Sequence, residues 1–335
     1  MARTWRITLA AAGLILVLSL PALVESSYQL RLANVIGIYL LLVLGLNFIL
    51  GYAGQLSFAQ VGFFGIGSYA AAILTTDHGL SFWIGLLAAA AVSGLSALLI
   101  GIPTLKLRGH YFAFGTFAFG EVVRLLAVNW DTLTHGASGL SGIPAPAIGG
   151  FRFDTDASFY YLVVFFALLG IAVSARVERS KIGRAMFAIR ESELAAEAMG
   201  IRTRQSKQTA FTLSAVFAGI AGALYAPLNT VISPDVFSFD VSVVVLVSLL
   251  LGGSGIITGA VLGTVLIVLL PEWLRFLDQY YMMIYGAGVV LLMVFMPQGL
   301  MGLMENLRVR RARAHAARAE AAPAGVGERT DRVAP

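Results

Sequence analysis

The stretch LANVIGIYLLLVLGLNFILGYAGQLSFAQVGFFGIGSYAAAILTT, from Leu32 to Thr76, contains no Asp, Glu, Lys or Arg. A helix needs about 20 predominantly apolar residues to cross the hydrocarbon core of a bilayer. The stretch accommodates two such helices, over Leu32–Leu50 and Phe58–Thr75, with a turn between them. It therefore predicts that this part of the chain lies within a membrane.

The rest of the chain has the same character. Of its 335 residues, 58% are apolar and 12% are charged, whereas soluble domains carry roughly 25% charged residues. We predict an all-α fold, a polytopic integral membrane helix bundle with about ten transmembrane helices. The candidate spans are Ile7–Val24, Leu32–Leu50, Phe58–Thr75, Phe82–Ile102, Tyr111–Val128, Phe159–Ala175, Ala210–Leu228, Val236–Leu251, Ile256–Leu270 and Met282–Phe295.

Three of these spans have alternative interpretations. The eighth and ninth are separated only by GGSG (Gly252–Gly255), so a re-entrant hairpin is an alternative to two full crossings. The first span has the basic start and apolar core of a secretory signal peptide. It lacks an A-x-A-like cleavage site and its apolar run is longer than a usual signal core, so we expect a retained helix.

The distribution of basic residues predicts the orientation, because cytoplasmic loops are enriched in Lys and Arg. With the N-terminus in the cytoplasm, 19 of the 23 Lys and Arg fall on the cytoplasmic side. Arg31, Arg152 and Arg275 fall outside, and Arg124 lies within a span. Both termini are therefore predicted to be cytoplasmic. We expect a membrane-spanning permease domain over residues 1–303 and a partly disordered basic cytoplasmic tail over residues 304–335.

The chain lacks the short motifs of common enzymes. It has no G-x-x-x-x-G-K-[ST] phosphate loop, no His pair at metal-ligand spacing and no G-x-S-x-G nucleophile motif. It also has no cysteine. We therefore expect no catalytic residue, no metal and no cofactor, and the net charge of +5 does not indicate a nucleic-acid partner. Uphill transport by such a chain requires an ion gradient or another protein as the source of energy.

One charged segment interrupts the apolar pattern. Residues 176–207 carry eight Lys or Arg and four Glu. The pattern predicts two short helices, Arg184–Arg190 and Leu194–Met199, with Ser192 as the N-cap of the second. Gly200 followed by the apolar Ile201 is typical of a Schellman ending.

This segment has two interpretations. It is either an amphipathic helix lying on lipid or a docking element for another protein. Lipid-binding helices usually combine Trp, Phe and Leu with Lys and Arg, whereas this segment combines Ala, Met and a single Phe with charges of both signs. Small residues with alternating charge favour docking into a protein groove. A membrane-spanning domain with a cytoplasmic docking element and no ATP-binding motif of its own indicates that a separately encoded protein supplies the energy.

The segment RSKIGRAMFAIRESELAAEAMGI (Arg179–Ile201) resembles the cytoplasmic coupling segment of the permease subunits of bacterial branched-chain amino acid ABC importers, specifically the longer of the two permeases. Further stretches resemble the same family in the same order, and the resemblance covers about Ile36 to Leu303. They are GYAGQLSFAQVGFFGIGSYAAAIL (Gly51–Leu74), TFAFGEVVRLL (Thr116–Leu126), VISPDVFSF (Val231–Phe239), LGGSGIITGAVLG (Leu251–Gly263) and MPQGLMG (Met296–Gly302). In THGASGLSGI the chain has His135 and Gly136 where the family often has two glycines.

The resemblance implies a division of labour in the bacterial cytoplasmic (inner) membrane. A periplasmic substrate-binding protein would deliver the amino acid, and this chain with a homologous second permease subunit would form the pathway. Two ABC ATPase subunits at the cytoplasmic face would bind the coupling segments. By this resemblance the contact with an ATPase is formed by Gly183, Arg184, Ala188, Arg190, Glu191, Ala196 and Gly200.

Two other functions remain open on the sequence. Some members of the family handle urea or short amides. A gradient-driven secondary carrier is the alternative from a different class, although such a carrier would be expected to have more intramembrane acidic or His side chains.

Polar residues within the predicted spans are candidates for lining the pathway. Glu121 and Arg124 lie three residues apart in the fifth span, which predicts an ion pair that stabilises the helix. The alternatives are a polar lining for a zwitterionic amino acid or a link to the second permease. The remaining pathway candidates lie at the start of the third span and are Gln55, Ser57, Gln60, Phe63 and Phe64.

Glycines recur in the third and ninth spans. Gly62, Gly65 and Gly67 lie in the third span, and Gly255, Gly259 and Gly263 repeat every four residues around the ninth. Small residues at such spacing let membrane helices approach closely. The pattern predicts close helix packing at both places.

Overall fold

The computed structural model describes residues 13, 15, 17–24, 26–107, 109–274 and 286 of the chain. The described part is mostly helical. Its α-helices are α2 (Ser27–Leu46), α3 (Gln60–Thr76), α4 (Phe82–Thr104), α5 (His110–Asn129), α6 (Asp131–Thr134), α7 (Asp156–Arg179), α8 (Lys181–Glu191), α9 (Glu193–Ala198), α10 (Thr203–Asn229), α11 (Phe239–Gly252) and α12 (Ile257–Leu274). A π-helix, η1 (Asn47–Tyr52), continues α2, and two 3₁₀-helices follow later, η2 (Gly136–Ser138) and η3 (Pro234–Phe237).

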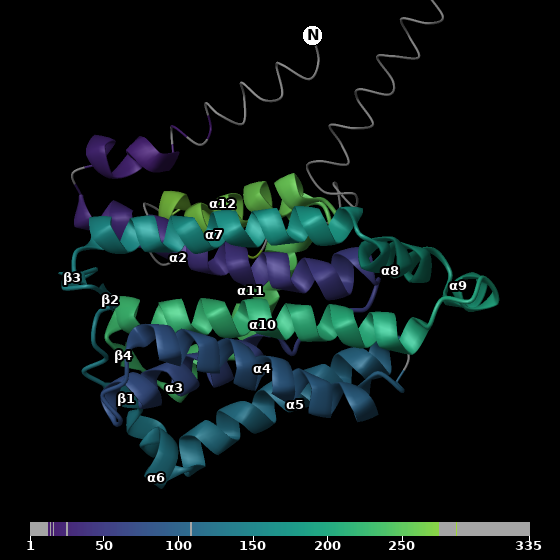
Figure 1. Ribbon diagram of the computed structural model, residues 1–335, viewed down its shortest axis with the longest axis horizontal. Coiled ribbons are helices and arrows are strands. Elements are labelled where there is room, and N and C mark those ends of the chain that lie inside the picture. Colours follow the sequence, from purple (N-terminus) through teal and green to yellow (C-terminus); the bar gives the residue numbers. More distant parts are fainter. Residues whose placement is uncertain are drawn as a thin grey trace, which may run out of the picture.

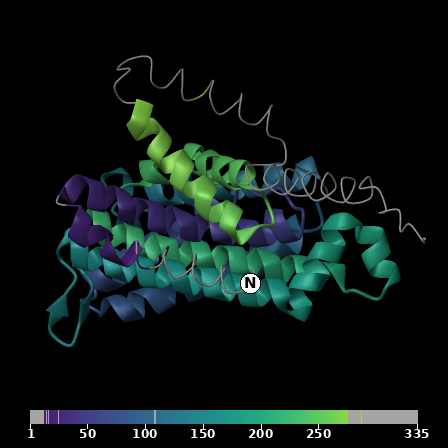
Figure 2. The same cartoon turned by 90° about the horizontal axis from the view of Figure 1, so that it is seen from above.

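The helices form an elongated bundle with distinct ends. Helix α10 runs through its middle and packs against α2, α3 and α4. The short strands gather at one end of the bundle and α8 and α9 lie at the other (Figure 1). Helix α12 crosses the other helices obliquely (Figure 2). This two-ended arrangement agrees with a chain whose loops alternate between two sides of a membrane.

Six helices within the described residues are long and apolar enough to cross a membrane. They are α2 with its π-helical continuation, α4, α5, α7, α10 and α12. The prediction of a polytopic membrane helix bundle is confirmed. The predicted span Met282–Phe295 lies almost wholly outside the described residues and Ile7–Val24 lies partly outside them, and the third and eighth predicted spans form helices of 17 and 14 residues.

The third and eighth predicted spans form helices that begin at mid-depth. Helix α3 begins at Gln60, whose Nε2 donates a hydrogen bond of 2.8 Å to the carbonyl oxygen of Leu42. Leu42 lies about 15 Å from the end of η1 at Tyr52, at 1.5 Å per helical residue. Helix α11 has 14 residues and therefore measures about 20 Å. Helix α11 is therefore too short to cross the bilayer alone.

The loop between α11 and α12 lies at the α8–α9 end of the bundle. The backbone N–H of Gly255 donates a hydrogen bond of 2.8 Å to Oδ1 of Asn47, at the start of η1. Helix α12 returns to the opposite end, where Tyr28 on α2 donates a hydrogen bond of 2.5 Å to Glu272. The chain therefore crosses through residues 231–252 and returns through α12, which argues against a re-entrant hairpin formed by α11 and α12.

Glycines allow the closest helix contacts, as the sequence predicts. A Cβ at Gly67 on α3 would collide with the backbone of Gly219 on α10. A Cβ at Gly259 on α12 would meet the carbonyl oxygen of Gly252 on α11 at 2.5 Å. Backbones this close leave room for polar ties such as the 3.0 Å hydrogen bond from Oγ of Ser68 to the carbonyl oxygen of Gly222. Small residues that bring backbones together stabilise helix packing in a membrane.

The end opposite α8 and α9 carries a small amount of β-structure, so the expected all-α fold is slightly wrong there. Strand β1 (Leu140–Ser141) pairs with β4 (Val231–Ile232), and β2 (Ala147–Ile148) pairs with β3 (Phe151–Arg152), both antiparallel. The segment from Asn129 to Ser158 is therefore tied to the bundle through the pairing of β1 with β4. His135 in this loop has a φ of 59°, a left-handed conformation that glycine adopts at less cost. This conformation explains why glycine suits the position.

Candidate functional site

The charged segment begins at a sharp corner between α7 and α8. Oγ of Ser180 accepts a hydrogen bond of 3.2 Å from the backbone N–H of Gly183 and caps α8. A Cβ at Gly183 would collide with the carbonyl oxygen of Val177. Glycine at position 183 therefore lets α8 turn tightly away from the end of α7.

Helix α8 buries the apolar face that the sequence predicts. Met186 and Ile189 are 0% and 4% exposed, and α8 packs against α7, α10 and η1. The ring of Phe187 lies 4.8 Å from that of Tyr52 on η1, measured between centroids. Met186 and Ile189 therefore fix α8 to its own bundle, whereas Ile182 and Arg184 on the same helix are exposed.

Arg190 joins α8 to two other segments. Its guanidinium donates a short hydrogen bond to the carbonyl oxygen of Gly51 on η1. A Cβ at Gly255 would lie 2.6 Å from Nη1 of Arg190, so Gly255 leaves space for the guanidinium. Gly255 also donates its N–H to Asn47. The end of α2, the loop before α12 and α8 therefore meet at one arginine.

Helix α9 is fixed to the start of α10. Ser192 caps α9 by accepting a hydrogen bond of 3.3 Å from the N–H of Ala195, as predicted. The N–H of Ile201 donates to the carbonyl oxygen of Ala196, and Gly200 has a φ of 81°, so the predicted Schellman ending is confirmed. Nζ of the buried Lys207 lies 2.6 Å from Oε1 of Glu193.

The outward face of α8 and α9 carries charged side chains and two prominent apolar ones. Arg184 and Glu191 are exposed. Leu194 and Met199 are 80% and 83% exposed. The sequence suggested the charged residues but not these two apolar ones, because a helix of six residues gives no periodicity that separates a buried from an exposed face. Ala196, a predicted contact residue, is buried.

The pathway candidates at the start of α3 lie in different surroundings. Phe63 and Phe64 are buried within the bundle. Gln60 is also buried, and its Oε1 accepts a hydrogen bond of 2.8 Å from Oγ of Ser214 on α10. Gln55 and Ser57 lie on the non-helical segment that leads from η1 into α3. The structure thus places Gln60, Phe63 and Phe64 among the contacts that hold α3 against α10.

Glu121 and Arg124 form the predicted ion pair on α5. Nε of Arg124 lies 3.0 Å from Oε1 of Glu121, and Nη2 lies 2.5 Å from the same oxygen. The two side chains are 37% and 27% exposed, so the pair lies at the surface of the bundle. Beside Glu121 a small pocket, too narrow to hold a water molecule, is lined by aromatic side chains, including Phe58, Phe117 and Phe239.

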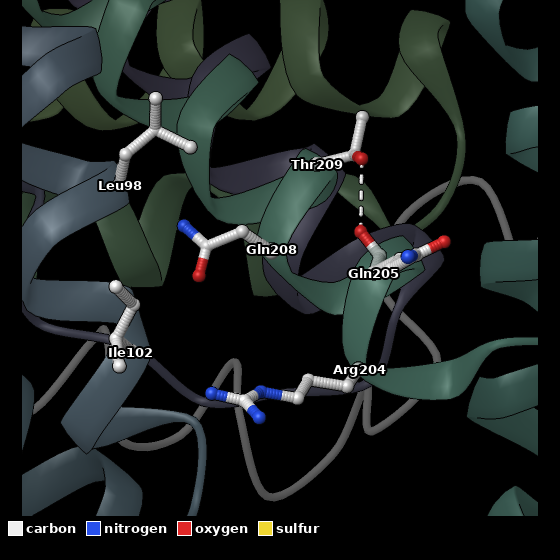
Figure 3. A pocket seen from close by; sticks show the side chains of 6 residues that line it. All are labelled: Leu98, Ile102, Arg204, Gln205, Gln208 and Thr209. Atoms are coloured by element: carbon white, nitrogen blue, oxygen red, sulfur yellow. Dashed lines mark hydrogen bonds between the residues drawn. The ribbon is translucent and has the colours of Figure 1, made fainter.

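A larger groove lies between α4 and α10. Its volume is about 630 Å³ and its lining combines apolar side chains of α4 with polar ones of α10, namely Leu98, Ile102, Arg204, Gln205, Gln208 and Thr209 (Figure 3). Gln208 donates a hydrogen bond of 2.9 Å to the carbonyl oxygen of Ala97, which fixes the two helices to each other along the groove. The groove lies close to the start of α10, near the charged segment.

Comparisons with known proteins agree with the resemblance seen in the sequence. The sequence model of a family described as "Branched-chain amino acid transport system / permease component" matches residues 28–296. The chain is 37% identical over 313 residues to the high-affinity branched-chain amino acid transport system permease protein LivM of Escherichia coli K12, covering 87% of this chain and 73% of that protein.

The chain also matches more distant relatives over most of their length. Identity is 25% over 294 residues to the permease protein BraD of Pseudomonas aeruginosa, covering 81% of this chain and 94% of BraD. Identity is 25% over 296 residues to the permease protein LivH of Escherichia coli K12, covering 81% of this chain and 93% of LivH. No solved structure gives a significant match.

Proposed function

Because the chain belongs to the family of permease components of branched-chain amino acid transport systems, we propose that it forms half of a translocation pathway for branched-chain amino acids. The protein is a multi-pass component of the bacterial inner membrane and is itself a transport component, not an enzyme. Energy for uphill transport therefore comes from other proteins. In this proposal two ABC ATPase subunits supply it at the cytoplasmic face.

The remaining partners follow from the same premise. Relatives of this chain include both LivM and LivH, two permease proteins of high-affinity branched-chain amino acid transport systems. This supports a pathway made by this chain and a homologous second permease. A periplasmic binding protein delivers the amino acid. In this arrangement residues 1–303 span the membrane about ten times, both termini are cytoplasmic, and residues 304–335 form a basic tail.

The observation that carries the proposal is the construction of the α8–α9 pair. Both helices are fixed to the bundle from within, α8 through Arg190 and α9 through the ion pair of Glu193 with Lys207. Their outward face exposes Leu194 and Met199. Exposed apolar side chains ringed by charge are typical of the central contacts of a protein interface. A lipid-facing helix would show a broader apolar face.

The contacts of α8 suggest how the pair transmits force. An ATPase that grips α8 and α9 moves a rigid element, because Met186 and Ile189 are packed and Arg190 is hydrogen-bonded. Arg190 meets the end of α2 at Gly51 and the loop before α12 at Gly255. A displacement of α8 therefore acts directly on two membrane-spanning helices.

The proposal is tested by placing a charge at each of the two exposed apolar residues, Leu194 in α9 and Met199 directly after it. We expect Leu194→Asp and Met199→Asp each to weaken ATPase binding about tenfold or more, because each removes an apolar side chain whose burial contributes about 1.5–3 kcal/mol. The matched control is Ile148→Asp, which changes an exposed apolar residue at the opposite end of the bundle. Binding is measured by co-purification of the ATPase subunits from detergent-solubilised membranes.

Transport distinguishes this function from a gradient-driven carrier. The complete complex in liposomes should accumulate labelled leucine only when ATP is present, and the Leu194→Asp and Met199→Asp variants should accumulate little. Accumulation by this chain alone, driven by a proton or sodium gradient, would refute the proposal. So would normal ATPase binding and normal uptake in both variants.

A further inference from the structure

The surface of α5 that carries Glu121 and Arg124 lies at mid-depth. Glu121 is the twelfth of the 20 residues of α5, so it lies about 17 Å from the start of the helix at 1.5 Å per residue. Arg124 lies about 4–5 Å further along the same helix. Both charges therefore fall well inside a hydrocarbon core that is about 30 Å thick.

The ion pair is partly exposed at this depth. The side chains of Glu121 and Arg124 are 37% and 27% exposed. Charged side chains within membrane spans almost always face protein or a water-filled cavity, because lipid does not solvate them. This face of α5 is therefore turned away from lipid in the working protein.

Two helices begin beside the ion pair. Oγ of Ser242, in the first turn of α11, donates a hydrogen bond of 3.1 Å to the carbonyl oxygen of Phe58, just before α3. The N–H of Phe58 donates a hydrogen bond of 3.0 Å to Oγ1 of Thr116 on α5. Non-helical backbone at membrane depth occurs where protein buries it or where it lines a water-filled cavity. Interrupted helices that meet near the midplane are characteristic of binding sites in transporters.

Aromatic rings complete the face. The ring of Phe239 lies 4.9 Å from that of Phe117 and 5.3 Å from that of Phe58, measured between centroids. Phe239 and Phe117 are 41% and 38% exposed. These rings and Glu121 line the same small pocket. A positive charge, a negative charge and an apolar surface therefore lie side by side at mid-depth.

We propose that this face contacts the substrate during transport, and that it selects an apolar α-amino acid in its zwitterionic form. The carboxylate meets Arg124, the ammonium group meets Glu121, and the apolar side chain lies against Phe117 and Phe239. The inference rests on the proposed function and makes its substrate specific. An uncharged amide or urea needs neither charge. The opposing face of the pathway belongs to the second permease.

Water access is the first test, and the chain suits it because it has no cysteine. In the complete complex reconstituted in liposomes, a charged methanethiosulfonate reagent should modify Phe117→Cys, and leucine delivered by the binding protein should slow the reaction several-fold. The matched control is Leu126→Cys, at an exposed position on the other flank of α5, which should not react. An unreactive Phe117→Cys would overturn the proposal, since it would mean that lipid or a protein seam covers the face.

Transport is the second test. The double variant Glu121→Gln/Arg124→Gln should lower leucine uptake about tenfold, a change equivalent to 1.4 kcal/mol. Its ATPase activity and its co-purification with the second permease should stay normal. The single variant Arg124→Lys, which keeps the positive charge, should retain more uptake than the double variant. Unchanged uptake, or loss of the second permease from the complex, would refute the substrate contact. If the unmodified complex takes up no leucine at all, the proposed function itself fails, so the two failures are distinguishable.

Discussion

The guanidinium of Arg190 on α8 donates a hydrogen bond to the carbonyl oxygen of Gly51, 139 residues earlier in the chain. The carbonyl belongs to a π-helix, a widened turn in which backbone groups are available to partners from outside the helix. Gly51, Gly54 and Gly255 surround the arginine and lack the Cβ that would obstruct it or its neighbours. Arg190 is exposed, as is its neighbour Glu191, yet its guanidinium joins α8 to η1.

Substitutions at these two neighbouring residues should therefore have different effects. We expect Arg190→Gln to leave membrane insertion and ATPase binding largely intact and to lower uptake per ATP hydrolysed, because α8 loses its bond to η1. Glu191→Arg should instead weaken ATPase binding, because this change reverses a charge on the outward face. The ratio of leucine uptake to ATP hydrolysis in liposomes measures the first effect, and subunit co-purification measures the second.

Arg184 provides the control for this pair of variants. Its side chain is exposed and donates a hydrogen bond of 3.0 Å to the carbonyl oxygen of Arg179 within the same corner. Arg184→Gln should lower binding without changing the uptake-to-hydrolysis ratio. Equal effects of Arg190→Gln and Glu191→Arg on both measurements would contradict the distinction.

The contact between α3 and α10 should be sensitive to a single methyl group. Gly67→Ala places a Cβ against the backbone of Gly219, so the helices must separate at a cost of about 1–3 kcal/mol. Gly94→Ala is the milder control, because its Cβ would meet a methyl group of Val216 at 3.0 Å, and a side chain can move. The apparent melting temperature of the purified protein, followed by tryptophan fluorescence, should fall clearly for Gly67→Ala and little for Gly94→Ala.

The ion pair between Glu193 and Lys207 should respond asymmetrically to truncation. Lys207 is buried whereas Glu193 is 39% exposed. Glu193→Ala leaves a buried ammonium group without its partner, which costs about 1–3 kcal/mol. Lys207→Met removes the buried charge and keeps most of the apolar stem, so it should cost less. In a double-mutant cycle, the double variant should be about as stable as Lys207→Met alone, and additive losses would argue against the pairing.

The left-handed residue at the opposite end of the bundle offers a backbone test. His135→Gly should change stability by no more than about 0.5 kcal/mol, because the strain it relieves is offset by greater freedom of the unfolded chain. His135→Ile should destabilise by about 1–2 kcal/mol, because a β-branched residue rarely adopts positive φ. Thermal unfolding of the two variants under identical detergent conditions decides the matter. A melting temperature for His135→Ile equal to that for His135→Gly would contradict the assigned conformation.

Local signals allowed several features to be predicted from the sequence. Ser192 and Gly200 marked the start and end of α9 because capping depends on neighbouring residues alone. The spacing of Glu121 and Arg124 predicted their ion pair for the same reason. The glycine pattern indicated close helix packing, although it did not identify which helices meet.

Features set by tertiary contacts were not predictable in this way. The start of α3 beside Leu42 of α2 is invisible to hydropathy, because apolar character alone does not show where a helix begins relative to its neighbours. Gln60 is a pathway candidate on the sequence, and its residue type alone does not show that its amide accepts a hydrogen bond from Ser214 on a neighbouring helix. The sequence does not indicate that Arg190 donates to the backbone of Gly51. Every residue has a carbonyl oxygen, so residue identity does not reveal which one accepts a hydrogen bond.

The short length of α11 has a consequence for biogenesis. Its 14 residues measure about 20 Å, too little for stable independent insertion into a hydrocarbon core about 30 Å thick. Strand β4 and the short 3₁₀-helix η3, which precede it, also need protein partners before they can leave water. Helix α11 packs mainly against α12 and α2, so residues 239–252 reach their final position only once α12 is in place. A nascent chain halted before α12 emerges would still hold this segment outside its final position.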